Sequence, residues 1–312
     1  MNLKKIIIAI TVVLVTVILG IFIFIPAVIN ISAAGYFNSN SRVCADYLLN
    51  ESNWQKWWPE KNTNDSSFVF QNTSFTITDR SPYAAGIDII KKNKKSINST
   101  IALILYKPDS TGFEWKCKLT PGNNPISRLE NYFLAVEIKK NMDKLMKAFT
   151  AYVGVKKNVY GVEIDKRKFT DTFMISTEKL VTAYPDNNTI YAVVNELTNY
   201  AKENGASMVH YPMMNIEKKD SSSYALKLAL PINKEIPSND KFRFRFMIQG
   251  NTLFAPVTGG NASIENAIEQ MRMYISDYKL SSPAIPFQSI VTDRFKESDT
   301  SKWVTNIYYP VM

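Results

Sequence analysis

The chain has 312 residues, of which 46% are hydrophobic and 21% are charged, and this balance excludes a disordered chain. Its net charge is +9 at pH 7, but the basic residues are scattered apart from a run at 91–95, which indicates an exposed hairpin turn, so we expect no nucleic-acid partner. Two cysteines and one histidine give little support to a zinc site, and we expect neither a metal nor a cofactor.

An uncharged apolar run opens the chain, from Ile6 to Ile29, with Lys4 and Lys5 before it. Because about 20 apolar helical residues span a bilayer core, residues 6–29 predict a membrane anchor within residues 1–30. The positive-inside rule places the N-terminus in the cytoplasm and the bulk of the chain across the membrane. A cleaved signal peptide is the alternative, since the small residues of 31–35 suit a peptidase.

The two cysteines leave two interpretations open. Cys44 falls on a predicted helix and Cys117 on a predicted strand. An exported compartment permits a disulfide between them, and two buried free thiols are the alternative.

Residues 31–155 form the first predicted domain. Residues 30–41 indicate a short extended linker, and Arg42–Asn53 indicates a helix. Turn signals then separate four predicted strands, which are Ser67–Thr78, Ala84–Ile90, Ile97–Tyr106 and Gly112–Leu119. A long helix is expected over Ile126–Tyr152, because its apolar residues recur at helical spacing.

This order of elements resembles the helix-grip fold of START-like proteins, the SRPBCC superfamily, over roughly residues 36–152. The specific motif is Asn53-Trp54-x-x-Trp57-x-Pro59, which follows the first helix. The resemblance implies a curved sheet that wraps the long helix around an apolar cavity for lipids or other hydrophobic ligands. Plain core packing is the alternative role of the tryptophans. The first strand of this fold is hard to find, because Ala33–Asn40 is short and polar.

A sequence repeat organises residues 156–312. Ile190–Ile216 aligns with Ile264–Ile290 at an offset of 74 residues, and Tyr224–Ile232 aligns with Trp303–Val311 at an offset of 79. The copies cover about residues 158–235 and 241–312. Two copies of one supersecondary unit predict an α+β domain with an antiparallel sheet, pseudo-twofold symmetry and a cleft where the copies meet.

Each copy is predicted to be β-β-α-β-β. The first copy has strands at Val159–Ile164, Thr172–Ala183, Pro212–Lys218 and Tyr224–Ile232, and a helix at Thr189–Asn204. The second has strands at Phe242–Gln249, Thr252–Val257, Phe287–Thr292 and Trp303–Val311, and a helix at Ser263–Tyr278. Gly205 is expected to end the first helix, and Ser263 is expected to cap the second.

The duplicated unit resembles the gyrase-inhibitor-like (GyrI-like) small-molecule-binding family over about residues 158–312. Its endings Ala229–Ile232 and Tyr308–Val311 carry the resemblance, together with Thr292-Asp293-Arg294. The same module is the effector-binding domain of many bacterial transcription activators of the AraC and MerR classes. The resemblance therefore implies that this part of the chain binds a small molecule.

Family members that bind cationic aromatic drugs commonly carry a glutamate near the position of Asn306. This chain has Asn306 and Lys227 instead, which argues against a cation-binding pocket unless another acid serves. Glu163 is the candidate acid, on the predicted first strand of the domain. A carboxylate inside an apolar groove is costly unless it is paired, so a buried Glu163 would indicate function.

Alternation along the last strand of each copy predicts which face is open. Tyr224 and the leucines at 226, 228 and 230 share an apolar face that should pack under a helix. The opposite face carries Lys227 in the first copy, and Asn306 and Tyr308 in the second. With Met213 and Phe287, which follow matched prolines, the predicted ligand-binding residues are Glu163, Lys227, Asn306, Tyr308, Met213 and Phe287.

Three functions are compatible with these features. The first is a membrane-anchored, non-catalytic protein that binds a small hydrophobic or aromatic molecule in a concave apolar site. The second is a hydrolase on a small hydrophobic substrate, with Glu163 as its general base in the same groove. The third is an interaction scaffold whose pockets have degenerated.

Overall fold

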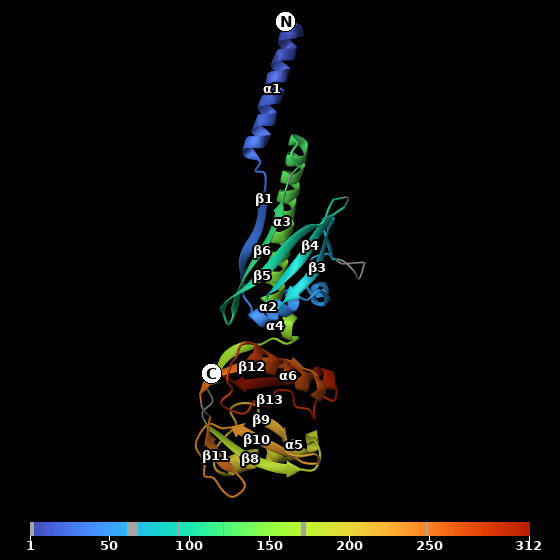
Figure 1. The fold of residues 1–312 in the computed structure, drawn as a ribbon. Helices are drawn as coiled ribbons and strands as arrows, with labels where there is room; N and C mark the ends of the chain where they lie inside the picture. Colours follow the sequence, from blue (N-terminus) through green and yellow to red (C-terminus); the bar gives the residue numbers. More distant parts are fainter. Residues whose placement is uncertain (1–2, 61–67, 93, 121, 170–172, 248) are drawn as a thin grey trace. The chain divides into compact units, whose positions relative to one another are not determined.

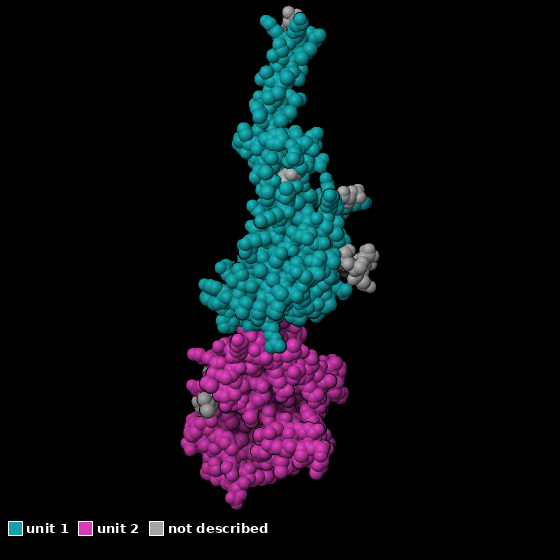
Figure 2. Space-filling view, in the orientation of Figure 1, with its two compact units in different colours: residues 1–155 teal, residues 156–312 magenta. Residues whose placement is uncertain are grey.

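The computed structural model describes residues 3–60, 68–92, 94–120, 122–169, 173–247 and 249–312. The chain divides into two compact units, unit 1 (residues 1–155) and unit 2 (residues 156–312), which Figure 2 colours separately. The predicted strand residues Ser67, Thr172 and Ile248 lie outside the described residues.

Unit 1 begins with α1 (Leu3–Phe24), a helix of 22 residues with a mean hydropathy of 3.3 and no buried residue. Among the described residues it is the one helix that is long and apolar enough to cross a membrane. A signal sequence near the N-terminus passes the same test of length and composition, although its apolar region is usually about 7–15 residues long. The helix ends before Pro26, whose ring and missing N–H are unsuited to a helix interior.

The body of unit 1 is an antiparallel sheet with a long helix against it (Figure 1). Its strands are β1 (Ile29–Phe37), β2 (Phe68–Phe70), β3 (Thr73–Ser81), β4 (Ala84–Lys91), β5 (Ile97–Lys107) and β6 (Ser110–Leu119), in the spatial order β1-β6-β5-β4-β3-β2. The helices are α2 (Ser41–Leu48), the 3-10 helix η1 (Glu51–Lys56) and α3 (Pro125–Val153). The predicted strands at 84–90, 97–106 and 112–119 and the predicted long helix are confirmed.

The predicted linker over residues 30–41 is wrong, because β1 pairs with β6 along its full length, from Ile29 opposite Leu119 to Phe37 opposite Thr111. Small residues in β1 leave room for the core. A Cβ on Gly35 would lie 3.0 Å from the ring of Phe113. Pairing and packing thus make a strand from a segment without a local strand signal.

Two further predictions in unit 1 need correction. The predicted helix over Arg42–Asn53 is two pieces, since α2 ends at Leu48 and η1 follows. The predicted strand over Ser67–Thr78 is a hairpin of β2 and β3. Gln71 and Asn72 turn the chain with φ angles of 48° and 60°, the left-handed conformation that a two-residue hairpin turn requires.

The tryptophan motif belongs to the core of unit 1. Trp54 is 1% exposed, and its indole Nε1 donates to the carbonyl oxygen of Leu48 at 2.7 Å. Trp57 donates to the carbonyl of Tyr47 at 2.9 Å and meets the ring of Phe149 on α3 edge-on at 4.9 Å. Both indoles are buried with their polar group satisfied, which is how tryptophan serves a core.

Unit 2 has an eight-stranded antiparallel sheet. Its strands are β7 (Asp165–Phe169), β8 (Phe173–Val181), β9 (Met213–Lys218), β10 (Tyr224–Pro231), β11 (Arg243–Phe246), β12 (Gly250–Thr258), β13 (Phe287–Ile290) and β14 (Val304–Pro310). Its helices are α4 (Lys156–Tyr160), α5 (Asn187–Glu203), α6 (Asn261–Asp277) and the 3-10 helix η2 (Thr300–Lys302). The spatial order is β11-β8-β10-β9-β13-β14-β12-β7.

The strand order of unit 2 reads alike from both ends. β9 and β13 pair at the centre, β10 and β14 flank them, and β8 and β12 come next. The outermost strands are exchanged: β7 pairs with β12 of the second half, and β11 pairs with β8 of the first half. Helices α5 and α6 have 17 residues each, and they start at Asn187 and Asn261.

Two predictions in unit 2 are wrong. The predicted strand over Val159–Ile164 falls on α4 and the bend after it, and β7 begins only at Asp165. Ser263 does not cap α6, because the N-cap position is Gly260. Gly205 ends α5 as predicted, with a φ angle of 69°.

The helix-facing side of the sheet forms the core of unit 2. On β10, Leu226, Leu228 and Leu230 are at most 1% exposed and pack in one cluster with Leu197 of α5. In the second half, Trp303, which precedes β14, and Thr305 and Ile307 of β14 are buried as well. The predicted inward faces are confirmed at these residues, whereas Tyr224 and Tyr309, predicted to share the faces, are half-buried. The opposite faces remain for a ligand.

Candidate ligand-binding groove in unit 2

A groove of about 770 Å³ lies in unit 2, whose hollowed surface is visible in Figure 2. Strand β10 contributes Lys227 and Ala229, which alternate with the buried leucines and so point away from α5. The apolar lining includes three methionines, Met174, Met213 and Met247, together with Ala229, Ile285 and Phe287. Methionine is flexible and polarisable, so this wall can adapt to ligands of irregular shape.

An aromatic cluster supports one end of the groove. Phe287, a lining residue, stacks on Tyr308 with ring centroids 4.9 Å apart and an interplanar angle of 11°. Phe169 meets both rings edge-on, at 5.5 Å and 5.7 Å. Stacked and edge-on pairs stabilise one another, so the ring of Phe287 is held in place before a ligand arrives.

The charged lining residues are mostly basic, with Lys227, Lys241, Arg243 and Arg245 against Glu178 and Asp240. Lys227 forms an ion pair with Glu217 at 2.7 Å, and this hydrogen bond lowers the pKa of the Glu217 carboxyl below its ordinary value. Arg245 donates from Nε to the hydroxyl of Ser176 at 3.2 Å. These contacts fix the orientation of two of the cations.

The structure brings together half of the predicted site residues. Lys227, Met213 and Phe287 line the groove, and Tyr308 supports it through Phe287. Asn306 lies on β14 opposite Ser289 and is not among the lining residues.

Glu163 lies elsewhere, exposed in the segment between α4 and β7, and does not line the groove. Its predicted place depended on a strand at Val159–Ile164, and the chain forms its strand six residues later. The carboxylates that do line the groove are Glu178 and Asp240.

The arginines of β11 were missed by the sequence analysis. Arg243 and Arg245 both line the groove. A signal was present, because alternation in the segment 243–246 places both guanidinium groups on one face and Phe244 and Phe246 on the other. Which face is open depends on the pairing of β11 with β8, which comes from distant sequence.

The cysteines in this structure are free and buried. Burial raises the pKa of the Cys44 thiol to about 12 and that of the Cys117 thiol to about 11. Since the thiolate is the reactive form, both groups are inert at neutral pH.

No family model and no curated protein matches the sequence. Among solved structures, the chain is similar to the C-terminal domain of EcmrR, with 15% identity, a TM-score of 0.42, and coverage of 48% of this chain and 98% of that domain. It is similar to a hydrolase from Listeria innocua, with 12% identity, a TM-score of 0.37, and coverage of 47% and 92%. It is also similar to SAV2435, solved with bound tetraphenylphosphonium, with 11% identity, a TM-score of 0.32, and coverage of 48% and 94%. Likeness at this level carries no argument about function.

Proposed function

We propose that this chain is a membrane-anchored, non-catalytic protein that binds a small hydrophobic or aromatic molecule in the groove of unit 2. The observation that carries the proposal is the groove itself. Its volume of about 770 Å³ suits a small molecule, and its walls combine methionine and aromatic side chains with a few oriented polar groups. Small-molecule sites have this size, roughly 300–1,000 Å³, and this composition.

The proposal includes the family resemblances. Unit 2 would be a GyrI-like effector-binding domain made of two β-β-α-β-β copies related by a pseudo-twofold axis. The strand order that reads alike from both ends, with its exchanged outer strands, supports this assignment. Unit 1 would be a START-like helix-grip domain, and its six-stranded sheet with the 29-residue helix α3 supports that assignment.

The proposed anchor is residues 6–29, with the N-terminus in the cytoplasm, the bulk of the chain on the other side, and no nucleic-acid partner. Helix α1 supports it, because none of its apolar residues is buried by the protein. Lys4 and Lys5 at its start supply the charge asymmetry that sets orientation.

The position of Glu163 gives the hydrolase alternative no support, because the residue is exposed and outside the groove lining. A general base must reach the proton that it abstracts. The scaffold alternative requires filled pockets, whereas this groove has room for a guest.

The test is to purify the full chain in detergent and identify bound compounds by mass spectrometry, with a thermal-shift screen of hydrophobic and aromatic compounds. We expect a bound compound whose affinity falls about tenfold in Phe287→Ala, because one aromatic wall is lost. Phe295→Ala is the matched control, since Phe295 is 58% exposed and outside the groove.

Ala229→Phe fills the groove without removing its wall, and it should block binding even if Phe287→Ala unfolds the domain. A chain that carries no compound and responds to none of the screened compounds would contradict the proposal. Equal binding by the wild type and Ala229→Phe would contradict the location.

A further inference from the structure

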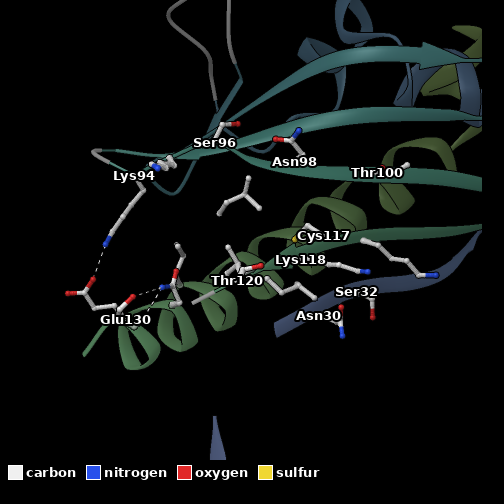
Figure 3. A pocket seen from close by; sticks show the side chains of 18 residues that line it. Asn30, Ser32, Lys94, Ser96, Asn98, Thr100, Cys117, Lys118, Thr120 and Glu130 are labelled. Atoms are coloured by element: carbon white, nitrogen blue, oxygen red, sulfur yellow. Dashed lines mark hydrogen bonds and ion pairs between the residues drawn. The ribbon is translucent and has the colours of Figure 1, made fainter. Parts of the chain in front are cut away.

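A second cavity lies within unit 1, where two neighbouring strands part. The ladder between β5 and β6 ends at the pair Ser99–Cys117. Beyond this pair β5 stays with β4 and β6 stays with β1, so the sheet opens between Asn98 and Lys118. The resulting cleft has a volume of about 1050 Å³, and residues of the first turns of α3 line its far wall (Figure 3).

The cleft is basic. Its charged lining residues, among those that the structure describes, are Lys94, Lys95, Lys116, Lys118 and Glu130. Glu130 pairs with Lys94 at 3.1 Å, and Lys116 pairs with Glu114 at 2.7 Å. Within the described part of the chain, Lys95 and Lys118 have no acidic partner. A cleft in which positive charge predominates attracts an anion.

Small polar side chains complete the lining. Figure 3 shows Asn30, Ser32, Ser96, Asn98, Thr100 and Thr120 around the opening. Beyond the pair Ser99–Cys117, the backbone groups of β5 and β6 that face each other across the cleft are not paired with each other. A phosphate group has several acceptor oxygens and suits such a combination of ammonium, hydroxyl and amide donors.

The cleft lies beside the end of α1. Arg128, in the first turn of α3, donates from Nη1 to the carbonyl oxygens of Phe22 at 3.2 Å and Ile25 at 3.0 Å. Its guanidinium lies over the ring of Phe22, 4.4 Å from the centroid. Ser127 and Asn131, which flank Arg128 on α3, line the cleft. One helical turn therefore joins the cleft to the end of the apolar helix.

An apolar stripe runs along the same half of α3. Ile126, Leu129, Phe133 and Val136 are 72%, 40%, 62% and 51% exposed. Their spacing of three or four residues places them on one face of the helix, and we call this set the α3 stripe. An exposed apolar face next to lysines is typical of a segment that lies in a membrane interface.

We propose that the cleft and the α3 stripe together bind an anionic phospholipid of the membrane that α1 spans. Lys95 and Lys118 hold the phosphate group, and the α3 stripe lies among the upper parts of the acyl chains. The inference rests on the proposed membrane anchor and is independent of the groove in unit 2. It accounts for the unpaired lysines, the parted strands and the exposed apolar face with one ligand.

The first test measures lipid selectivity. The full chain is extracted from vesicles of phosphatidylcholine and phosphatidylglycerol, and the retained lipids are counted by native mass spectrometry. We expect enrichment of phosphatidylglycerol and a fall in that enrichment of about tenfold in Lys95→Gln/Lys118→Gln, since charge-assisted hydrogen bonds are the strong ones. Lys144→Gln/Lys147→Gln removes the same charge from α3 outside the cleft and should change nothing. Equal enrichment in both double variants would overturn the proposal.

The second test measures depth. A nitroxide on Phe133→Cys should be protected from a water-soluble relaxation agent and exposed to oxygen in vesicles, whereas a nitroxide on Lys147→Cys should show the reverse. The native thiols do not compete for the label, because both are buried. A Phe133→Cys label in water would overturn the role of the α3 stripe.

A third measurement separates a lipid from a soluble phosphate. Inorganic phosphate is titrated against the full chain in pure phosphatidylcholine vesicles, and the acylation of Lys95 is followed by mass spectrometry. Protection by inorganic phosphate equal to that by phosphatidylglycerol would identify a soluble anion and overturn the lipid assignment. If the full-length gene product is recovered from cells without residues 1–30, the segment is cleaved and the proposed anchor is wrong. Neither a soluble anion in the cleft nor a cleaved anchor would change ligand binding in unit 2.

Discussion

The two halves of unit 2 have the same order of paired strands and helices of equal length, but the ends of their helices differ. The N-cap of helix α5 is Asp186, whose carboxylate accepts a hydrogen bond from the N–H of Thr189 at 2.8 Å, and Gly205 follows its C-cap with a φ angle of 69°. The N-cap of helix α6 is Gly260, which offers no side-chain cap, and Lys279 follows its C-cap with a φ angle of 52°. The two helices have equal lengths although their caps differ. Packing against the sheet therefore determines where these helices begin and end more than local capping signals do.

The cores of the two halves of unit 2 also differ at a matched position. Leu226 of β10 and Thr305 of β14 are matched positions, and both are 0% exposed. The hydroxyl of Thr305 accepts a hydrogen bond from Nη2 of Arg294 at 3.1 Å, and the guanidinium lies over the ring of Trp303 at 4.8 Å. Burial lowers the pKa of Arg294. The second half thus carries a buried polar pair where the first half has leucine.

The largest effect is expected from breaking that polar pair. Arg294→Met and Thr305→Val should each lower the free energy of unfolding by about 1–3 kcal/mol, because each leaves a buried partner unsatisfied. The double variant should lose less than the sum, by about 1 kcal/mol, in denaturant titrations.

Leu226→Val is the control for this cycle, since it trims the matched position without touching Arg294. Its effect should add to that of Arg294→Met. Strict additivity of Arg294→Met and Thr305→Val would mean that the pair contributes nothing to the difference between the halves.

A smaller effect, of opposite sign in the two halves, is expected at the helix ends. Gly205→Ala should destabilise unit 2 by about 1 kcal/mol, because its left-handed backbone penalises a Cβ. Lys279→Gly should stabilise it by a similar amount, since it removes that penalty from α6. Thermal unfolding of both variants measures the contrast, and shifts of the same sign would refute it.

The smallest effect is a pH dependence confined to α5. The hydrogen bond with Thr189 lowers the pKa of the Asp186 carboxyl in the folded chain. Stability from this cap is therefore present above the unfolded pKa, about 3.9, and is lost as the pH falls through the folded value. Hydrogen exchange in the first turn of α5, corrected for intrinsic rates, should accelerate below about pH 4, whereas that of α6 should not.

Asp186→Asn separates capping from titration. The amide still accepts the hydrogen bond but carries no ionisable group, so the pH dependence should vanish while the helix remains. An unchanged acid response in Asp186→Asn would assign the effect to another group.

Long periodic segments could be predicted from the sequence, and the edges of the sheets could not. Helix α3 lies within one residue of its predicted bounds, because its apolar stripe repeats over many turns. Strand β7 was missed, because four of its five residues are exposed and charged, from Asp165 to Lys168, and it is defined only by its pairing with β12. Charged side chains on an edge strand oppose aggregation. The same charges remove the apolar alternation from which a strand is predicted.

The candidate site residues could likewise be predicted where they lie on periodic strands and could not be predicted elsewhere. Met213, Phe287 and Lys227 were found because alternation and matched prolines fix their faces. Glu163 was misplaced together with the strand that was meant to carry it. The cleft of unit 1 had no local signal, since it arises where the ladder between β5 and β6 stops.

Because the outer strands are exchanged, unit 2 cannot be cut into two fragments that each keep all their strand pairs. Because β7 belongs to the sheet of the second half and β11 to that of the first, a cut in the connection near residues 233–241 would leave each fragment with a strand that has lost its neighbour. Each fragment would then expose a bare hydrogen-bonding edge and pair with the other fragment or with itself. Each half therefore depends on a strand that pairs with the other half, and we expect neither half to fold as a separate domain.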